Sequence, residues 1–166
     1  MILSAACPRA TTLCSPAALA REYDYIYAAV GSHPDAADEV NDAVLDRYRK
    51  LCRENPKIKA VGEIGLDYYY EDIPRDIQKK AFVAQMELAR ELKKPVIVHE
   101  REAHQDGMDI VTAFPEVTGV FHCFSGSAEM AGCPGLVRGL YGCADLQKRP
   151  PCPGSRRSGA PGPGGH

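Results

Sequence analysis

Hydrophobic and polar positions along the first three quarters of the chain follow two periods, one typical of strands and one typical of helices. Short runs rich in β-branched and aromatic residues, each followed by turn residues, predict strands at 23–31, 57–65, 96–99 and 117–124. Apolar residues at helical spacing predict helices at 38–55 and 75–94, and a shorter one around 108–114. Regular alternation of strand and helix indicates an α/β fold with parallel strands, in about four βα units.

Three of these strands carry a residue that can bind a metal at or near their carboxyl ends. These residues are Glu63, His99 and His122. Active sites of (β/α) barrels are built at this end of the strands, whereas an open nucleotide-binding sheet needs a glycine-rich first turn that the sequence lacks. We therefore predict a partial (β/α) TIM-type barrel with a hydrolytic metal centre.

The composition says more about the cellular compartment of the protein than about its function. A net charge of −2 over 166 residues does not indicate a polyanion partner, although a nuclease needs only a local basic groove. Seven cysteines without a C-x-x-C pair fit neither a disulfide framework nor a zinc ribbon. The apolar N-terminus is interrupted by Pro8, Arg9 and Pro16, and no apolar run is long enough to span a membrane. We expect a cytoplasmic protein without membrane contact.

The pattern changes beyond Ala131. The segment 132–166 is rich in glycine, proline and arginine and has almost no periodic apolar residues. We expect a barrel domain over residues 1–131 and a disordered basic tail over residues 132–166.

Several motifs resemble the TatD family of metal-dependent deoxyribonucleases, which belongs to the amidohydrolase-like barrel superfamily. They are GEIGLDYY around Glu63, the helix with Gln78 and Gln85 that continues into LARELKKPVIVHER, and HCFSGS around His122. The resemblance covers roughly residues 20–131. Several motifs in the right order are more specific than any one of them.

The resemblance implies a site for two divalent metal ions, with Mg, Mn and Zn all compatible with carboxylate and imidazole ligands. Glu63 corresponds to the catalytic glutamate that bridges both metals in the family, and His99 and His122 correspond to ligands of one of them. The family holds the other metal with an H-x-H pair on its first strand and a late aspartate, and neither has a match here. This implies that the chain starts near the family's second strand, and a shift of reading frame after Ala131 would explain the tail.

Other candidate residues have a structural alternative beside the functional one. Arg101 can grip a substrate phosphate or form an ion pair with Glu100 or Glu102. Asp67 can orient a metal ligand from behind or cap a loop. The three tyrosines at 68–70 can stack on single-stranded bases, but packing in a loop is the commoner role of such a run. We assign His33 and His104 to a turn and to the surface, respectively. Cys123 points away from His122 across the strand, so the two cannot form a dyad.

The sequence therefore predicts a TatD-like metal-dependent hydrolase, a deoxyribonuclease whose substrate is DNA and in particular single-stranded ends. Two alternatives remain open. One is a metal-dependent hydrolase of a small ester or amide, and the other is a non-catalytic fragment, because a full barrel needs about 250 residues.

Overall fold

In the computed structural model, which describes residues 2–6, 15–70 and 72–122, the described residues form one five-stranded parallel sheet with its strands in chain order. The strands are β1 (Ile2–Ala6), β2 (Tyr27–Gly31), β3 (Ile58–Asp67), β4 (Val96–Arg101) and β5 (Gly119–His122). The helices are α1 (Ser15–Glu22), the 3-10 helix η1 (Pro34–Glu39), α2 (Asp42–Glu54), α3 (Arg75–Leu92) and α4 (His104–Thr112). Each strand up to β4 is followed by a helix, which confirms the predicted βα succession.

The four predicted strands correspond to β2 through β5, whereas β1 was not predicted. It pairs in parallel with β2 over its whole length, from Ile2 opposite Tyr27 to Ala6 opposite Gly31. Its five residues, ILSAA, include two alanines and a serine, which have no strong strand preference. The segment forms a strand because it pairs with β2, a tertiary contact that its own sequence does not indicate.

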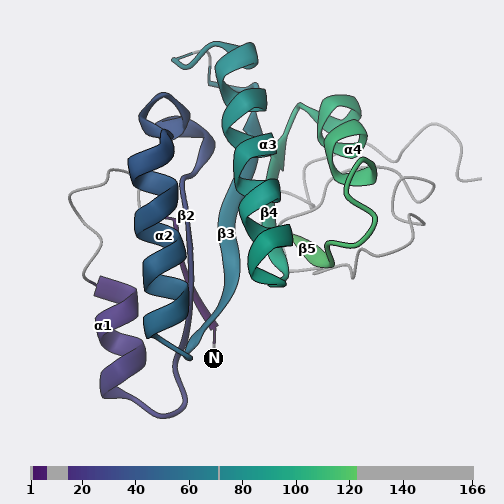
Figure 1. Cartoon of the computed structure of the whole chain (residues 1–166). Coiled ribbons are helices and arrows are strands. Elements are labelled where there is room, and N and C mark those ends of the chain that lie inside the picture. The colour runs from purple at the N-terminus through teal and green to yellow at the C-terminus, as the bar shows by residue number, and fades with distance from the viewer. Residues whose placement is uncertain (1, 7–14, 71, 123–166) are drawn as a thin grey trace, which may run out of the picture.

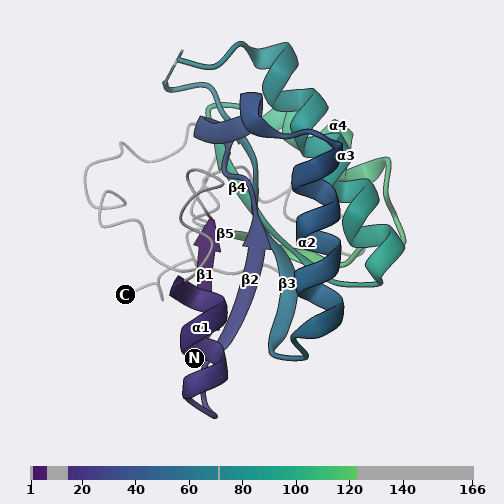
Figure 2. The same cartoon turned by 60° about the vertical axis from the view of Figure 1, so that its left-hand side comes forward.

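The helices α2, α3 and α4 lie on one face of the sheet, as two views show (Figures 1 and 2). The long helix α3 lies beside β3, and its buried side chains recur every three or four residues. Phe82 and Met86 are fully buried in a core with Ile64, Leu66 and Val98 from the strands. A second core forms where Tyr48 and Cys52 of α2 pack with residues of α1 and β2.

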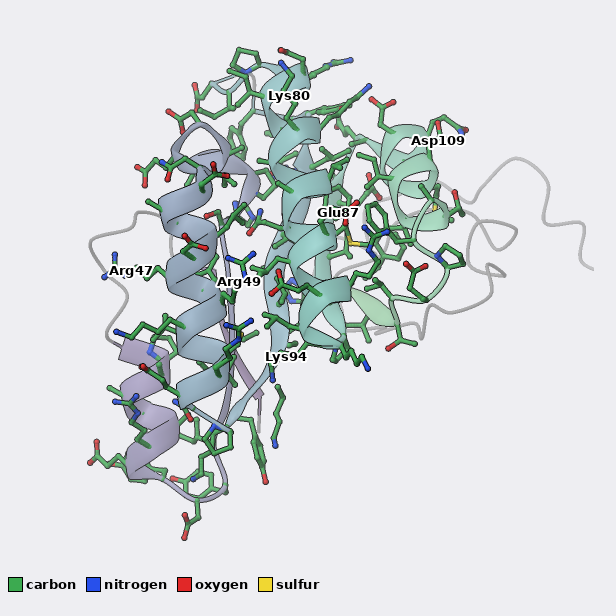
Figure 3. The ribbon with its side chains drawn as sticks, viewed as in Figure 1. Arg47, Arg49, Lys80, Glu87, Lys94 and Asp109 are labelled. Carbon is green, nitrogen blue, oxygen red and sulfur yellow. The ribbon has the colours of Figure 1, made fainter. Side chains whose placement is uncertain are left out.

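The outer side of the helix layer is charged. Figure 3 shows Arg49 on α2 and Glu87 on α3 among the side chains on this side. The guanidinium of Arg49 donates to both carboxylate oxygens of Glu91 at 2.8 Å and so links α2 to α3. Such exposed pairs contribute little to stability, so the buried apolar residues hold these helices to the sheet.

Among the described residues, no helix is both long and apolar enough to cross a membrane. The predicted tail at 132–166, the proposed boundary at Ala131 and the side chain of Cys123 lie outside the described residues.

Candidate metal centre

The parallel register brings the candidate residues to one face of the sheet. Gly65 lies opposite His99 and Asp67 opposite Arg101, while His99 lies opposite His122 on the next strand. Because side chains alternate between faces along a strand, Asp67, His99 and Arg101 point away from the helices. We call this side the metal face. Glu63, two residues before Gly65 on β3, also lies on it, in contact with His99.

Glu63 lies between the two histidines that were predicted with it. Its Oε1 lies 2.7 Å from Nδ1 of His122 and 3.3 Å from Nδ1 of His99. The Glu63 side chain is 14% exposed, that of His99 21% and that of His122 50%. The three predicted residues therefore meet at one carboxylate oxygen that solvent and small ions can reach.

His33 also belongs to this cluster, although the sequence analysis placed it only in a turn. His33, Glu63 and His99 each offer one ligand atom, and these atoms all lie within 4.8 Å of one another. The rings of His33 and His99 meet edge to face with centroids 4.3 Å apart. His33 follows the end of β2 by two residues, which is the same strand-end signal that identified the other ligands. Its second contact is with Asp35, whose Oδ1 lies 3.0 Å from Nδ1 of His33.

Asp67 contacts His99 from behind. Its Oδ2 lies 3.0 Å from Nε2 of His99, on the opposite side of the ring from Glu63. Its Oδ1 accepts hydrogen bonds from the backbone N–H groups of Tyr69 at 3.0 Å and Tyr70 at 3.4 Å. One oxygen of Asp67 faces the histidine and the other accepts from the loop, so both alternatives for Asp67 stay open.

These contacts shift the acid–base properties of the cluster. Burial raises the pKa of the Glu63 carboxyl, but the hydrogen bonds and charges of His99 and His122 outweigh it and lower the pKa to about 2. Burial lowers the pKa of His99, but Glu63 and Asp67 outweigh it and raise the pKa above its ordinary value. Glu63 is therefore an anion across the physiological range, and a cation at this site competes with the proton on His99.

Two buried glutamines of α3 hold the strand ends that carry these residues. Gln78 accepts from the backbone N–H of Asp67 and donates to its carbonyl oxygen, both at 2.9 Å. Gln85 does the same for Ser32, at 2.6 and 3.1 Å, immediately before His33. Both glutamines belong to a sequence motif to which no role was assigned from the sequence. A polar residue on the buried stripe of an amphipathic helix was the available signal.

Gly65 allows β3 and β4 to approach closely behind the cluster. A Cβ at this position would lie 2.0 Å from the carbonyl oxygen of His99, and its φ of +139° is one that other residues rarely adopt. The second glycine of the GEIG motif is therefore required for the register between Glu63 and His99.

Arg101 lies beyond His99 on the same face. Its guanidinium lies 3.7 Å from the ring centroid of Tyr69 and 5.3 Å from that of Tyr70. Within the described part of the chain, no ion pair joins Arg101 to Glu100 or Glu102. Glu100 is buried and instead accepts from the N–H of Ala103 and contacts His104. The ion-pair alternative for Arg101 was therefore wrong.

The tyrosine run has two different environments. Tyr68 is buried, and its hydroxyl donates to Asp106 at 2.6 Å, so the packing interpretation holds for it. Tyr69 and Tyr70 are 52% and 57% exposed and their rings contact each other, so the packing and stacking interpretations both stay open for these two.

The donors in this cluster fit a divalent cation. The anionic carboxylate of Glu63 lies beside imidazole nitrogens, and the second ring nitrogen of His99 contacts the carboxylate of Asp67. This arrangement is typical of metal sites in proteins. Nitrogen and oxygen ligands suit Zn, Mn and Mg to different degrees, and the ligand types alone do not select one.

Comparisons with known proteins identify similar sequences over most of the chain. The sequence profile of the family described as TatD related DNase matches residues 3–142, so the match extends beyond both limits, 20 and 131, that the motifs indicated. The uncharacterized metal-dependent hydrolase YabD of Bacillus subtilis is 44% identical over 115 residues, which are 66% of this chain and 44% of that protein. The human 3'-5' RNA nuclease TATDN2 is 38% identical over 123 residues, which are 72% of this chain and 16% of that protein.

Solved structures similar to this chain also include TatD proteins. The crystal structure of YJJV, a TatD homolog from Escherichia coli, superposes with a TM-score of 0.70 and 33% identity, covering 78% of this chain and 50% of that one. A TatD family hydrolase from Entamoeba histolytica, at 24% identity and a TM-score of 0.67, shares the fold. The chain spans about half the length of most of the curated relatives it matches. The profile match over residues 3–142, the similar sequences and the shared fold show that the chain belongs to the TatD family.

Proposed function

We propose that this chain is part of a metal-dependent nuclease that hydrolyses phosphodiester bonds of DNA, with Glu63, His99 and His122 as metal ligands and Glu63 as the central catalytic residue. The observation that carries this proposal is the position of the Glu63 carboxylate between the two histidines. Several relatives are named as nucleases, including the 3'-5' ssDNA/RNA exonuclease TatD of Escherichia coli, which is 32% identical over 126 residues. The proposed substrate is therefore a single-stranded end.

The residues of the chain have distinct roles in this proposal. Glu63 stays anionic because His99 and His122 lower its pKa to about 2, so it attracts a divalent cation. His33 supplies a further nitrogen within reach of the same cation. Asp67 accepts from Nε2 of His99, which keeps Nδ1 directed to Glu63. When bound, the metal supplies Lewis acidity for a phosphodiester and its attacking water.

The compartment and domain limits are also proposals. We assign the protein to the cytoplasm because its cysteines show no disulfide pattern, and Cys52 is a free, buried thiol. We assign the catalytic unit to residues 1–131 and treat 132–166 as a separate tail. A hydrolase of small esters or amides, or a non-catalytic fragment, are the two competing functions.

Cleavage of a labelled single-stranded oligonucleotide tests the proposal. We expect degradation with Mg²⁺, Mn²⁺ or Zn²⁺, loss of degradation on addition of a chelator, and loss in Glu63→Gln. Glu87→Gln is the matched control, because Glu87 is an exposed glutamate on the outer side of α3 that pairs with Arg90. Chelator-sensitive hydrolysis of a small ester without any nuclease activity would favour the esterase alternative. A chain that binds no metal and cleaves neither substrate would be the non-catalytic fragment.

A further inference from the structure

Two exposed tyrosines and an arginine form a compact surface next to the metal face. The rings of Tyr69 and Tyr70 meet edge to face with centroids 4.9 Å apart, and Arg101 lies over both of them. About half of each tyrosine is exposed to solvent. We call Tyr69, Tyr70 and Arg101 the stacking platform.

The stacking platform is coupled to the metal centre through the backbone. Arg101 follows His99 by two residues on β4, so both point to the same face about 7 Å apart along the strand. The carboxylate of Asp67 accepts from the N–H groups of Tyr69 and Tyr70 with one oxygen and contacts His99 with the other. The tyrosines are thereby held at a defined position beside the ligands.

Tyr69 and Tyr70 differ in their environment from the tyrosine that precedes them. Tyr68, the preceding residue, is buried and bonded to Asp106, so the loop could bury a tyrosine but leaves the next two in solvent. Arg101 has no carboxylate partner within the described residues, and its main contacts are the two rings. Exposed aromatic faces and an arginine free of a carboxylate partner are the features with which proteins hold unpaired bases and their phosphates.

We propose that the stacking platform binds single-stranded nucleic acid, with an unpaired base stacked on Tyr70 and the Arg101 guanidinium directed to the adjoining phosphate. This inference rests on the proposed function, because it places the bound strand beside the metal centre. Arg101 covers one face of the Tyr69 ring, so Tyr69 holds the guanidinium in place and Tyr70, the more exposed ring, offers the stacking surface. A duplex hides its base faces and binds more weakly.

Binding of labelled oligonucleotides in a chelator, where no cleavage occurs, tests the platform separately from catalysis. The probes are a single-stranded oligothymidylate, an abasic strand of equal length and charge, and a duplex, measured by fluorescence anisotropy. We expect the wild-type chain to bind the oligothymidylate about five- to a hundredfold more tightly than the abasic strand, from stacking of one base. Tyr69→Ala/Tyr70→Ala should remove this preference, and Tyr70→Phe should retain it because the ring remains.

The chain contains a matched control pair. Tyr23 and Tyr25 are exposed tyrosines before β2 with ring centroids 5.8 Å apart, at the end of the strands opposite the metal centre. Tyr23→Ala/Tyr25→Ala should leave the preference for bases unchanged. Arg101→Gln should weaken the binding of both the oligothymidylate and the abasic strand. It should also reduce the slope of log affinity against log salt by about one.

The outcomes separate the platform from the proposed function. A wild-type chain that binds the abasic strand or the duplex as tightly as the oligothymidylate overturns the platform, even if it cleaves DNA with metal. A preference for bases that survives in Tyr69→Ala/Tyr70→Ala also overturns it. A base preference that this variant loses supports the platform, and absence of metal-dependent cleavage in the same preparation would then contradict only the proposed function.

Discussion

The helix side and the metal face of β3 and β4 depend on different properties of their side chains. On the helix side of β3 and β4, Ile64, Leu66 and Val98 are completely buried against α3. On the metal face, Glu63 and His99, each next to one of these residues in sequence, remain partly exposed and contact each other through polar atoms. The apolar face depends on buried volume, which tolerates some rearrangement, whereas the metal face depends on the positions of individual atoms.

The largest effect is expected on the helix side. Phe82→Ala removes a fully buried ring from the core beneath β3 and should lower the free energy of unfolding by about 3–5 kcal/mol. Urea unfolding followed by circular dichroism measures it. The adjacent Val83 is 38% exposed, so Val83→Ala should change stability by less than about 0.5 kcal/mol. Equal losses of stability in Phe82→Ala and Val83→Ala would contradict the assignment of Phe82 to the buried side of α3.

Gln85 of α3 bonds the backbone of Ser32 directly after β2, next to His33. Gln85→Leu leaves the N–H and carbonyl of buried Ser32 without these partners and should cost about 2 kcal/mol. Gln105→Leu on α4 is the control, since the hydrogen bond of Gln105 to Asp109 is exposed. A Gln85 variant as stable as the control would show that the buried hydrogen bonds do not hold the end of β2.

Asp67 tests the metal face without removing a proposed ligand. Asp67→Asn keeps an oxygen that can accept from Tyr69 and Tyr70 but loses the negative charge against His99. Loss of such a partner typically weakens metal affinity by about 10- to 100-fold. Calorimetric titration with Mn²⁺ measures this, and a variant with unchanged affinity would leave Asp67 with a role in the loop only.

A smaller effect is expected in the pH dependence of the metal-free protein. The pKa of Glu63 falls from 4.5 to about 2 in the folded state, so its contribution to stability is complete above pH 4.5 and is lost toward pH 2. The pKa of His99 rises from 6.5, so its contribution is complete below pH 6.5 and is lost at higher pH. Thermal unfolding in a chelator should show these two groups contributing most between pH 4.5 and 6.5. Glu63→Gln should flatten the acid limb, and an unchanged profile would contradict the coupling.

Sequence patterns predicted which residues lie on the metal face where a candidate ligand stands at the end of a clear strand. Glu63, His99 and His122 each end or nearly end a clear hydrophobic run, and the structure brings them together. Their roles as ligands, and those of Arg101 and Asp67, remain predictions. His33 also follows a strand end, but it was missed because its GSHPD segment was interpreted as a turn, and the contact of its ring with His99 forms only in the folded chain.

Other features depended on tertiary contacts that no local pattern contains. The strand β1 forms because β2 lies beside it, although its own sequence is weakly strand-like. Tyr68, Tyr69 and Tyr70 are identical residues with different exposure, which the turn after β3 determines. Composition alone could not separate the buried tyrosine from the two exposed ones.

The most direct test of the central claim, that Glu63 organises a metal centre on the metal face, is calorimetric titration of Mn²⁺ into the wild-type chain, Glu63→Gln and the control Glu87→Gln. We predict binding to the wild-type and control proteins and at least about 100-fold weaker binding to Glu63→Gln, because the central anion is lost while the fold is kept. Circular dichroism is the check that all three proteins are folded. Equal Mn²⁺ affinity in Glu63→Gln and the wild-type chain, or no binding to the wild-type chain, would contradict the account.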